Sequence, residues 1–135
     1  MTIELSTLIY NVRNELSSIP DDLITSEQIH DELIKSNLYI SYIIDSEFDD
    51  ENIIKQALIS LAAYYSYVNY TALVSLRMDD VPQYVYQREK ILKAIALQFL
   101  KLITKYPLDS NLMIDEKLLG KIGAIGYTNT NSIWS

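Results

Sequence analysis

The chain of 135 residues contains no cysteine and a single histidine, His30. Without cysteine, a disulfide scaffold, a thiolate metal site and a cysteine nucleophile are all excluded. A single imidazole likewise excludes histidine-rich metal sites and any mechanism that needs two histidines. His30 lies beside Asp31 and Glu32, a polar setting that favours an exposed histidine over a catalytic one. Several classes of enzyme and metalloprotein are therefore excluded by missing residue types alone.

Glycine and proline are scarce and unevenly placed. The first 119 residues contain no glycine, and all three glycines fall within residues 120–126. A glycine-free stretch of this length, rich in Leu, Ile, Ala, Glu and Lys, favours helices over a turn-rich β fold. Pro20, Pro82 and Pro107 mark breaks between helical segments, because proline cannot continue the hydrogen-bond ladder of a helix.

Apolar periodicity predicts an all-α bundle of about four helices, with a long central third helix and an extended C-terminal arm. Apolar residues make up 49% of the chain, which is too many for a disordered protein. The expected helices cover residues 3–18, 26–45, 50–77 and 82–105. We therefore predict a helical domain over residues 1–106 and a docking arm over residues 107–135.

The segment 50–77 carries no charge from Ala57 to Leu76 and is apolar nearly all round. Such a helix must be covered nearly all round. Three coverings fit the sequence: lipid, the domain's own core, or that core together with a neighbouring subunit. Tyrosines at mid-span argue against lipid, because in membrane helices they gather at the ends. Tyrosine suits a subunit interface, and the predicted interface tyrosines are Tyr64, Tyr67 and Tyr70.

The segment 82–105 is expected to bury one face and to expose lysines on another. The predicted buried residues are Tyr84, Ile91, Leu92, Ile95, Phe99, Leu102 and Ile103. Lys93, Lys101 and Lys105 form a basic stripe on the other side. This stripe is either a solvated face or the contact for an acidic neighbour, and in the second case Lys93 and Lys101 belong to the subunit interface.

The net charge of −7 is divided unevenly along the chain. Residues 1–60 hold 12 acidic and three basic residues, a net charge of −9, whereas residues 61–135 hold six acidic and eight basic residues, a net charge of +2. A net acidic chain is a poor candidate for tight nucleic-acid binding. The opposite signs either steer copies of the chain together or simply mark two solvated faces.

The C-terminal arm ends in large apolar residues spaced by glycine, asparagine and threonine. The arm residues predicted to dock onto a partner are Ile122, Ile125, Tyr127, Ile133 and Trp134. Aromatic anchors of this kind contribute strongly to protein interfaces. The arm either folds back on its own core or reaches into another protein.

No motif points to catalysis. The Gly120-x-x-Gly123-x-x-Gly126 spacing is not that of a nucleotide-binding fingerprint, since no strand precedes it. The acidic pairs Asp49-Asp50 and Asp79-Asp80 lie where helices are about to start, which favours helix capping. We therefore expect no enzyme, no catalytic residue, no metal ligand and no cofactor.

The order of these parts resembles that of the small head–tail connector proteins of tailed bacteriophages, also called adaptors or head-completion proteins. The resemblance rests on the first helix with Val12-Arg13, the Thr25–Ile29 helix start, the Ala62–Tyr67 run, the Pro82–Tyr106 helix containing Arg88, and the polar-aromatic arm. It covers the layout of most of the chain. One departure is that the chain lacks a strand-like insertion that some connector proteins carry.

The resemblance implies a structural virion protein that forms a ring, a dodecamer, between the portal and the tail. The arm and the helix ends would dock onto the portal protein, tail or further connector proteins would bind below, and genomic DNA would pass through the lumen without specific binding. It implies assembly in the host cytoplasm and a final place in the neck of the virion, with no membrane contact. The rival interpretation is a small acidic helical module, chaperone-like or regulatory, that captures a partner peptide in a groove.

Overall fold

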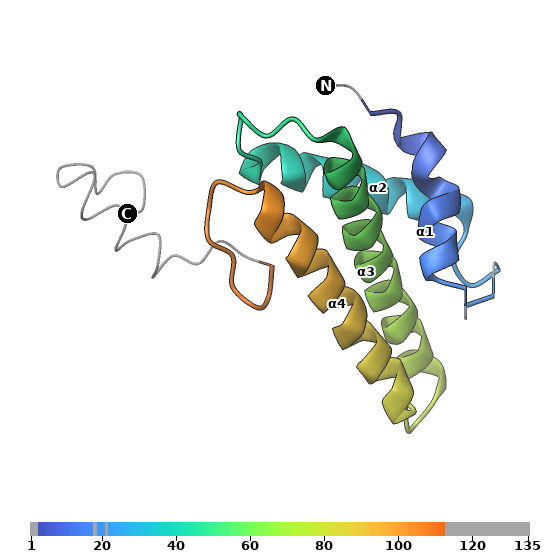
Figure 1. Ribbon diagram of the computed structural model, residues 1–135. Coiled ribbons are helices and arrows are strands. Elements are labelled where there is room, and N and C mark those ends of the chain that lie inside the picture. Colours follow the sequence, from blue (N-terminus) through green and yellow to red (C-terminus); the bar gives the residue numbers. More distant parts are fainter. Residues whose placement is uncertain (1–2, 18, 21, 113–135) are drawn as a thin grey trace.

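A computed structural model describes residues 3–17, 19–20 and 22–112. In this part of the chain a 3₁₀ turn, η1, is followed by four α-helices, and no strand is present (Figure 1). The elements are η1 (Leu5–Leu8), α1 (Ile9–Glu15), α2 (Ser26–Ile43), α3 (Glu51–Arg77) and α4 (Gln83–Ile103). The predicted all-α bundle with a long third helix is confirmed, while most of the predicted C-terminal arm lies outside the described residues.

The first helix is shorter than the sequence predicts, because its start is wound as a 3₁₀ turn. The backbone N–H and the side-chain hydroxyl of Thr7 both donate to the carbonyl oxygen of Glu4, at 3.2 and 2.7 Å. These bonds between residues three apart favour 3₁₀ winding over the α-helix. The apolar repeat nevertheless holds, since Leu8, Val12 and Leu16 are all buried.

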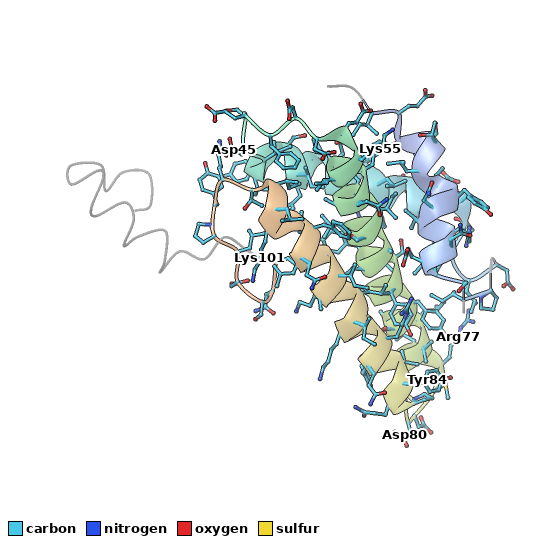
Figure 2. The ribbon with its side chains drawn as sticks, viewed as in Figure 1. Asp45, Lys55, Arg77, Asp80, Tyr84 and Lys101 are labelled. Carbon is cyan, nitrogen blue, oxygen red and sulfur yellow. The ribbon has the colours of Figure 1, made fainter. Side chains whose placement is uncertain are left out.

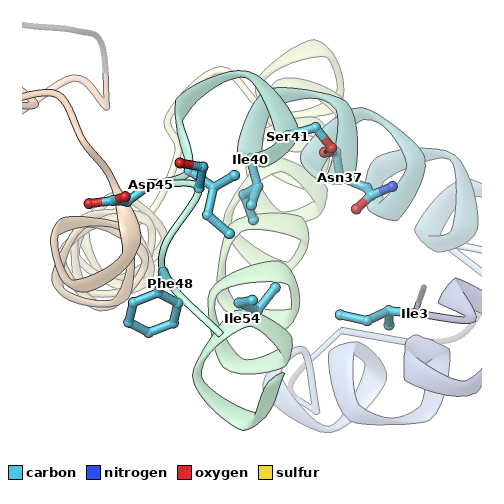
Figure 3. Close-up of a pocket in the computed structure, with 9 residues that line it drawn as sticks. Ile3, Asn37, Ile40, Ser41, Asp45, Phe48 and Ile54 are labelled. Carbon is cyan, nitrogen blue, oxygen red and sulfur yellow. Dashed lines mark hydrogen bonds between the residues drawn. The ribbon is translucent and has the colours of Figure 1, made fainter. Parts of the chain in front are cut away.

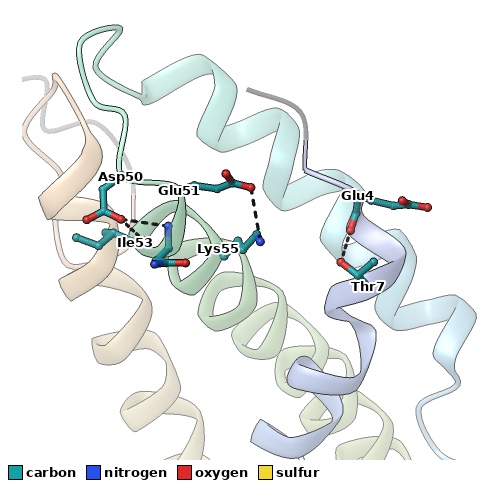
Figure 4. Close-up of polar contacts among 7 residues, drawn as sticks. Glu4, Thr7, Asp50, Glu51, Ile53 and Lys55 are labelled. Atoms are coloured by element: carbon teal, nitrogen blue, oxygen red, sulfur yellow. Dashed lines mark hydrogen bonds and ion pairs between the residues drawn. The ribbon is translucent and has the colours of Figure 1, made fainter.

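Side-chain caps fix where α2 and α3 begin. Thr25 and Gln28 form a complete capping box at the start of α2, with bonds of 3.1 and 2.7 Å. Asp50 accepts hydrogen bonds from the backbone N–H groups of Asn52 and Ile53 at the start of α3 (Figure 4). Local sequence therefore sets where these two helices start, and the predicted capping role is confirmed for Asp50. It is wrong for the pair Asp79-Asp80, because the N-cap of α4 is Pro82 and no side chain caps that helix.

The helix α3 is the centre of the fold and contacts α1, α2 and α4. Every residue from Ala57 to Ala63 is buried, and the alanines at 57, 62 and 63 are completely covered. Small side chains let neighbouring helices approach closely, which is how one helix is covered by three others. None of the described helices is both long enough and apolar enough to cross a membrane.

The buried face of α4 differs from the predicted one. The buried residues are Val85, Leu92, Ala96, Leu100 and Ile103. Tyr84, Ile91 and Leu102, which were expected in the core, are 68%, 49% and 59% exposed. Apolar residues occur in adjacent pairs at 91–92 and 102–103, so the helical period fits either of two neighbouring faces about 100° apart. Packing against α3 selects the second of them.

The chain after α4 turns back onto the helices. An antiparallel bridge joins Ile44 and Thr104, and beyond it Leu108 and Leu112 are buried. The Tyr39 hydroxyl donates to the carbonyl oxygen of Leu112, and Lys93 Nζ donates to Asn111 Oδ1 at 3.0 Å. Residues 107–112, the first six of the predicted arm, thus pack on the helical domain.

Candidate interaction surfaces

A groove of about 430 Å³ lies between α3, α4 and the end of α1. Its residues are Ser17, Tyr67, Tyr70, Tyr84, Gln87, Arg88 and Ile91, and we call it the tyrosine groove. The ring centroids of Tyr67 and Tyr70 lie 5.4 Å apart. Burial raises the pKa of Tyr67, the neighbouring Tyr70 adds to this, and Arg88 opposes it. The groove is therefore an aromatic surface with one cation in its wall.

Arg88 is held in place by the first helix. One of its guanidinium nitrogens donates to the backbone carbonyl oxygen of Glu15 at 3.2 Å. Glu15 is the last residue of α1, and a cation is favourable beside the carbonyl groups that end a helix. Within the described part of the chain no carboxylate forms an ion pair with Arg88. A fixed cation beside three tyrosines can therefore accept a carboxylate from a partner.

The outer side of α2 carries a second apolar surface. Ile34, Leu38 and Tyr42 follow one another every four residues and are 40%, 66% and 69% exposed. They point away from the core, because Ile29, Leu33, Ile40 and Ile43 occupy the opposite side of the helix. We call these three residues the α2 stripe. A row of exposed large apolar residues on one helix face is typical of a surface that binds another protein.

A third hollow, of about 410 Å³, lies where the N-terminal segment meets the end of α2 and the start of α3 (Figure 3). Its apolar lining includes Ile3, Ile40 and Phe48, and Asp45 is its one charged residue. Its lining includes neither a histidine nor a cation. This hollow therefore has no positively charged side chain that would attract an anion.

A polar cluster joins α2 to α3. Glu32 is nearly buried, and its Oε1 accepts a hydrogen bond from Asn69 Nδ2 at 3.1 Å and lies 3.3 Å from Lys35 Nζ. Burial raises the pKa of Tyr65, with smaller contributions from Tyr64 and Glu32. Burial likewise raises the pKa of Tyr39 to about 12, assisted by Tyr65 and Asp109. A charge with two partners at a helix contact serves to fix how α2 lies on α3.

The predicted interface residues do not form one surface. Tyr67 and Tyr70 line the tyrosine groove, but Tyr67 is almost entirely buried by its own chain. Burial and then Glu89 raise the pKa of Tyr64, which places Tyr64 beside α4. Lys93 is two residues from Ile91, which turns it to the other side of α4, where it bonds to Asn111. Of the predicted interface residues, Tyr70 is therefore the one in the groove that a partner can contact most readily.

Lys101 lies far from Tyr84, because the two are near opposite ends of the hairpin formed by α3 and α4. Figure 2 shows Arg77, Asp80 and Tyr84 together at the far end of this hairpin and Lys101 near its other end. Lys101 is exposed in the last turn of α4. The predicted docking residues Ile122, Ile125, Tyr127, Ile133 and Trp134 lie outside the described residues.

The sequence predicts only part of the two apolar surfaces. It indicates Tyr67 and Tyr70 of the groove as interface residues but places Tyr84 and Ile91 in the core, and it gives no prediction for the α2 stripe. The recurrence of Ile34, Leu38 and Tyr42 every four residues was the available signal, because it marks a second apolar face beside the core-facing one.

Among the described residues, no group of three or more His, Cys, Asp or Glu side chains could hold a metal ion. No known protein family, curated protein or solved structure matches the chain.

Proposed function

We propose that this chain is a structural subunit of a head–tail connector, forming a ring between the portal and the tail of a tailed phage. The observation that supports this most directly is the presence of two exposed apolar surfaces on different elements of one small helical body. A subunit that binds its neighbours head to tail needs two different surfaces, and such contacts generate rings when the rotation closes. The order of helices, which resembles that of connector proteins, supplies the other half of the argument.

In this proposal the ring surfaces and the portal contact are separate. The helical domain associates with copies of itself, while the C-terminal residues, with the chain's single tryptophan Trp134, dock onto the portal protein. Tail or further connector proteins bind the opposite end of the ring. DNA slides through the lumen without specific binding, since an acidic subunit offers few cations to hold phosphate groups.

The test is binding of the full chain to portal rings of the same phage. We expect the two to co-sediment, with an added layer of density beneath the portal in electron micrographs. Trp134 fluorescence should shift to the blue on binding, because the indole moves out of water. Trp134→Ala should weaken the complex, while Tyr10→Ala, at an exposed residue of α1, should not. A chain that binds no portal ring would overturn the proposal.

The tyrosine groove favours one alternative, a small acidic module that captures a partner peptide. An aromatic groove of about 430 Å³ with a cation in its wall suits a peptide that carries both an apolar anchor and a carboxylate. Such a module should be a monomer or dimer with no affinity for portal rings. The same co-sedimentation experiment therefore separates the two functions.

A further inference from the structure

We infer that the tyrosine groove of one copy receives the α2 stripe of a second copy, so that the chain associates with itself head to tail. This pairing specifies the contact between neighbouring subunits of the proposed ring, and it rests on the proposed function only in requiring that copies associate. The shapes of the two surfaces, their charges and their separate positions in the fold all support it.

The two surfaces match in shape and chemistry. The groove is a concave aromatic surface, with Tyr70, Tyr84 and Ile91 open to a partner. The α2 stripe is a convex row on a helix, with its most exposed members, Leu38 and Tyr42, one helical turn apart. A helix whose apolar face lies in an apolar groove is a common mode of protein recognition, with anchors three or four residues apart.

The charges of the two helices are complementary. The outer side of α2 carries Glu27 and Asp31 in line with Leu38, because residues separated by four and seven positions share a helix face. Both carboxylates are exposed, and neither has an ion-pair partner among the described residues. The groove presents Arg88, which is fixed by Glu15 and likewise lacks a carboxylate. Acidic residues beside the stripe can therefore meet the one cation of the groove.

Whole-helix charge points the same way. The helix α2 has three acidic residues and one basic residue, a net charge of −2, while α4 has four basic residues and one acidic residue, a net charge of +3. Like charges would oppose pairing of α2 with α2 or of α4 with α4. Opposite charges favour the mixed pairing and speed the encounter of two copies.

The placement of the surfaces decides the kind of assembly. The stripe belongs to α2, whereas the groove is built from α3, α4 and Ser17, which follows α1. One copy can therefore offer its two surfaces to two different neighbours. When copies bind through two unlike surfaces, a linear assembly always has one unoccupied stripe at one end and one unoccupied groove at the other. Only a closed ring occupies both. A two-fold dimer through either surface alone is not expected.

The absence of cysteine allows a direct test by disulfide cross-linking of the full chain. We expect a Leu38→Cys chain and an Ile91→Cys chain to form a cross-linked dimer when mixed and oxidised at millimolar concentration. Each single variant alone should form little cross-linked product, and the double variant should form a ladder of oligomers. Tyr10→Cys, at an exposed residue of α1 outside both surfaces, replaces Leu38→Cys as the control and should not cross-link to Ile91→Cys.

A complementation experiment tests the same pairing without cross-linking. Leu38→Glu blocks the stripe and Ile91→Glu blocks the groove, so each should weaken self-association at least about tenfold, as loss of an interface anchor does. A mixture of the two variants should form a one-to-one dimer by sedimentation, because each retains the surface that the other has lost. Tyr10→Glu should associate like the unchanged chain. Circular dichroism checks that every variant keeps its helices.

Several outcomes would overturn the inference. One is a chain that stays monomeric at millimolar concentration with no cross-link between positions 38 and 91. Another is cross-linking of Leu38→Cys to itself, which would show a two-fold contact. A cross-link from Ile91→Cys to Trp134→Cys, with none to Leu38→Cys, would assign the groove to the C-terminal segment. Portal binding that survives any of these results would leave the connector function standing while this pairing fails.

Discussion

Two stretches of α3 have similar apolar sequences but very different surroundings. In residues 54–63 only Lys55 and Gln56 escape burial, and Leu61 is completely covered. In residues 72–77 no side chain is buried, and Leu76 is 85% exposed. Figure 1 shows the reason, since α1 and α2 cross α3 near its first half, while its far end projects beyond them beside α4.

An apolar stretch of sequence therefore indicates that a helix surface is unfavourable in water, but it does not indicate whether the same chain or a partner covers that surface. In the first stretch the chain itself supplies the cover. At the far end Leu76 remains exposed, and so does Tyr84, which lines the groove that we assign to a second copy. An uncharged helix with one end exposed therefore fits the self-association that we propose.

The largest expected effect contrasts one leucine from each stretch. Leu61→Ala should lower the free energy of unfolding by about 2–5 kcal/mol, because it leaves a cavity in the core. Leu76→Ala should change it by less than about 0.5 kcal/mol, as exposed substitutions do. Both changes carry the same helix propensity difference, so only burial differs. Urea unfolding followed by circular dichroism measures both, and equal losses would mean that the two stretches are covered alike.

An overpacking pair sharpens the same contrast. Ala62 is completely buried and Ala72 is exposed on the same helix. Ala62→Leu should lower the free energy of unfolding by about 1–3 kcal/mol, because a close-packed core has no room for three more carbon atoms. Ala72→Leu should leave the melting temperature nearly unchanged. A tolerated Ala62→Leu would show that α2 and α4 do not press closely on α3.

How much of this fold the sequence predicts depends on whether the signal is local. Nearby residues are enough to predict the caps at Thr25 and Asp50. The same holds for the helix breaks at Pro20 and Pro82 and for the long third helix. It does not hold for the buried face of α4, because the adjacent pair Ile91-Leu92 offers two faces of equal apolarity. Only contact with α3 decides between them.

The candidate surfaces were harder to predict than the fold for the same reason. The tyrosine groove joins residues of α3 and α4 to Ser17, and no spacing in the sequence brings these together. The sequence indicates Tyr70 because tyrosine suits a subunit interface, but Arg88, which lines the same groove, enters only through the family resemblance. The contact between Arg88 and Glu15 is a product of folding that periodicity does not reveal.

A smaller loss of stability is expected on substitution of Asn69, which links α3 to α2 through its hydrogen bond to Glu32. Asn69→Ala removes the 3.1 Å hydrogen bond to the nearly buried Glu32 and should cost about 0.5–1.5 kcal/mol, since water reaches the freed carboxylate from one side. Asn52→Ala, on the same helix, is the control, because the Asn52 side chain forms no hydrogen bond within the described residues. Thermal unfolding should separate the two variants, and equal losses would mean that the contact with Glu32 contributes nothing measurable.

The smallest effect is an alkaline loss of stability in the covered half of the molecule. Burial raises the pKa of Tyr39 from 10.0 to about 12, so the folded chain keeps this phenol proton at a pH where the unfolded chain has lost it. The stabilisation is therefore complete below pH 10 and disappears as the pH rises through 12. Because Tyr39 is partly solvated, we expect a loss of about 1 kcal/mol or less over this interval. Tyr39→Phe should be less stable at neutral pH, having lost its bond to the Leu112 carbonyl oxygen, but should lose less between pH 10 and 12. Urea unfolding midpoints measured between pH 10 and 12 test this. If the midpoints of the unchanged chain and of Tyr39→Phe fall in parallel, Tyr39 is not the source of the alkaline loss of stability.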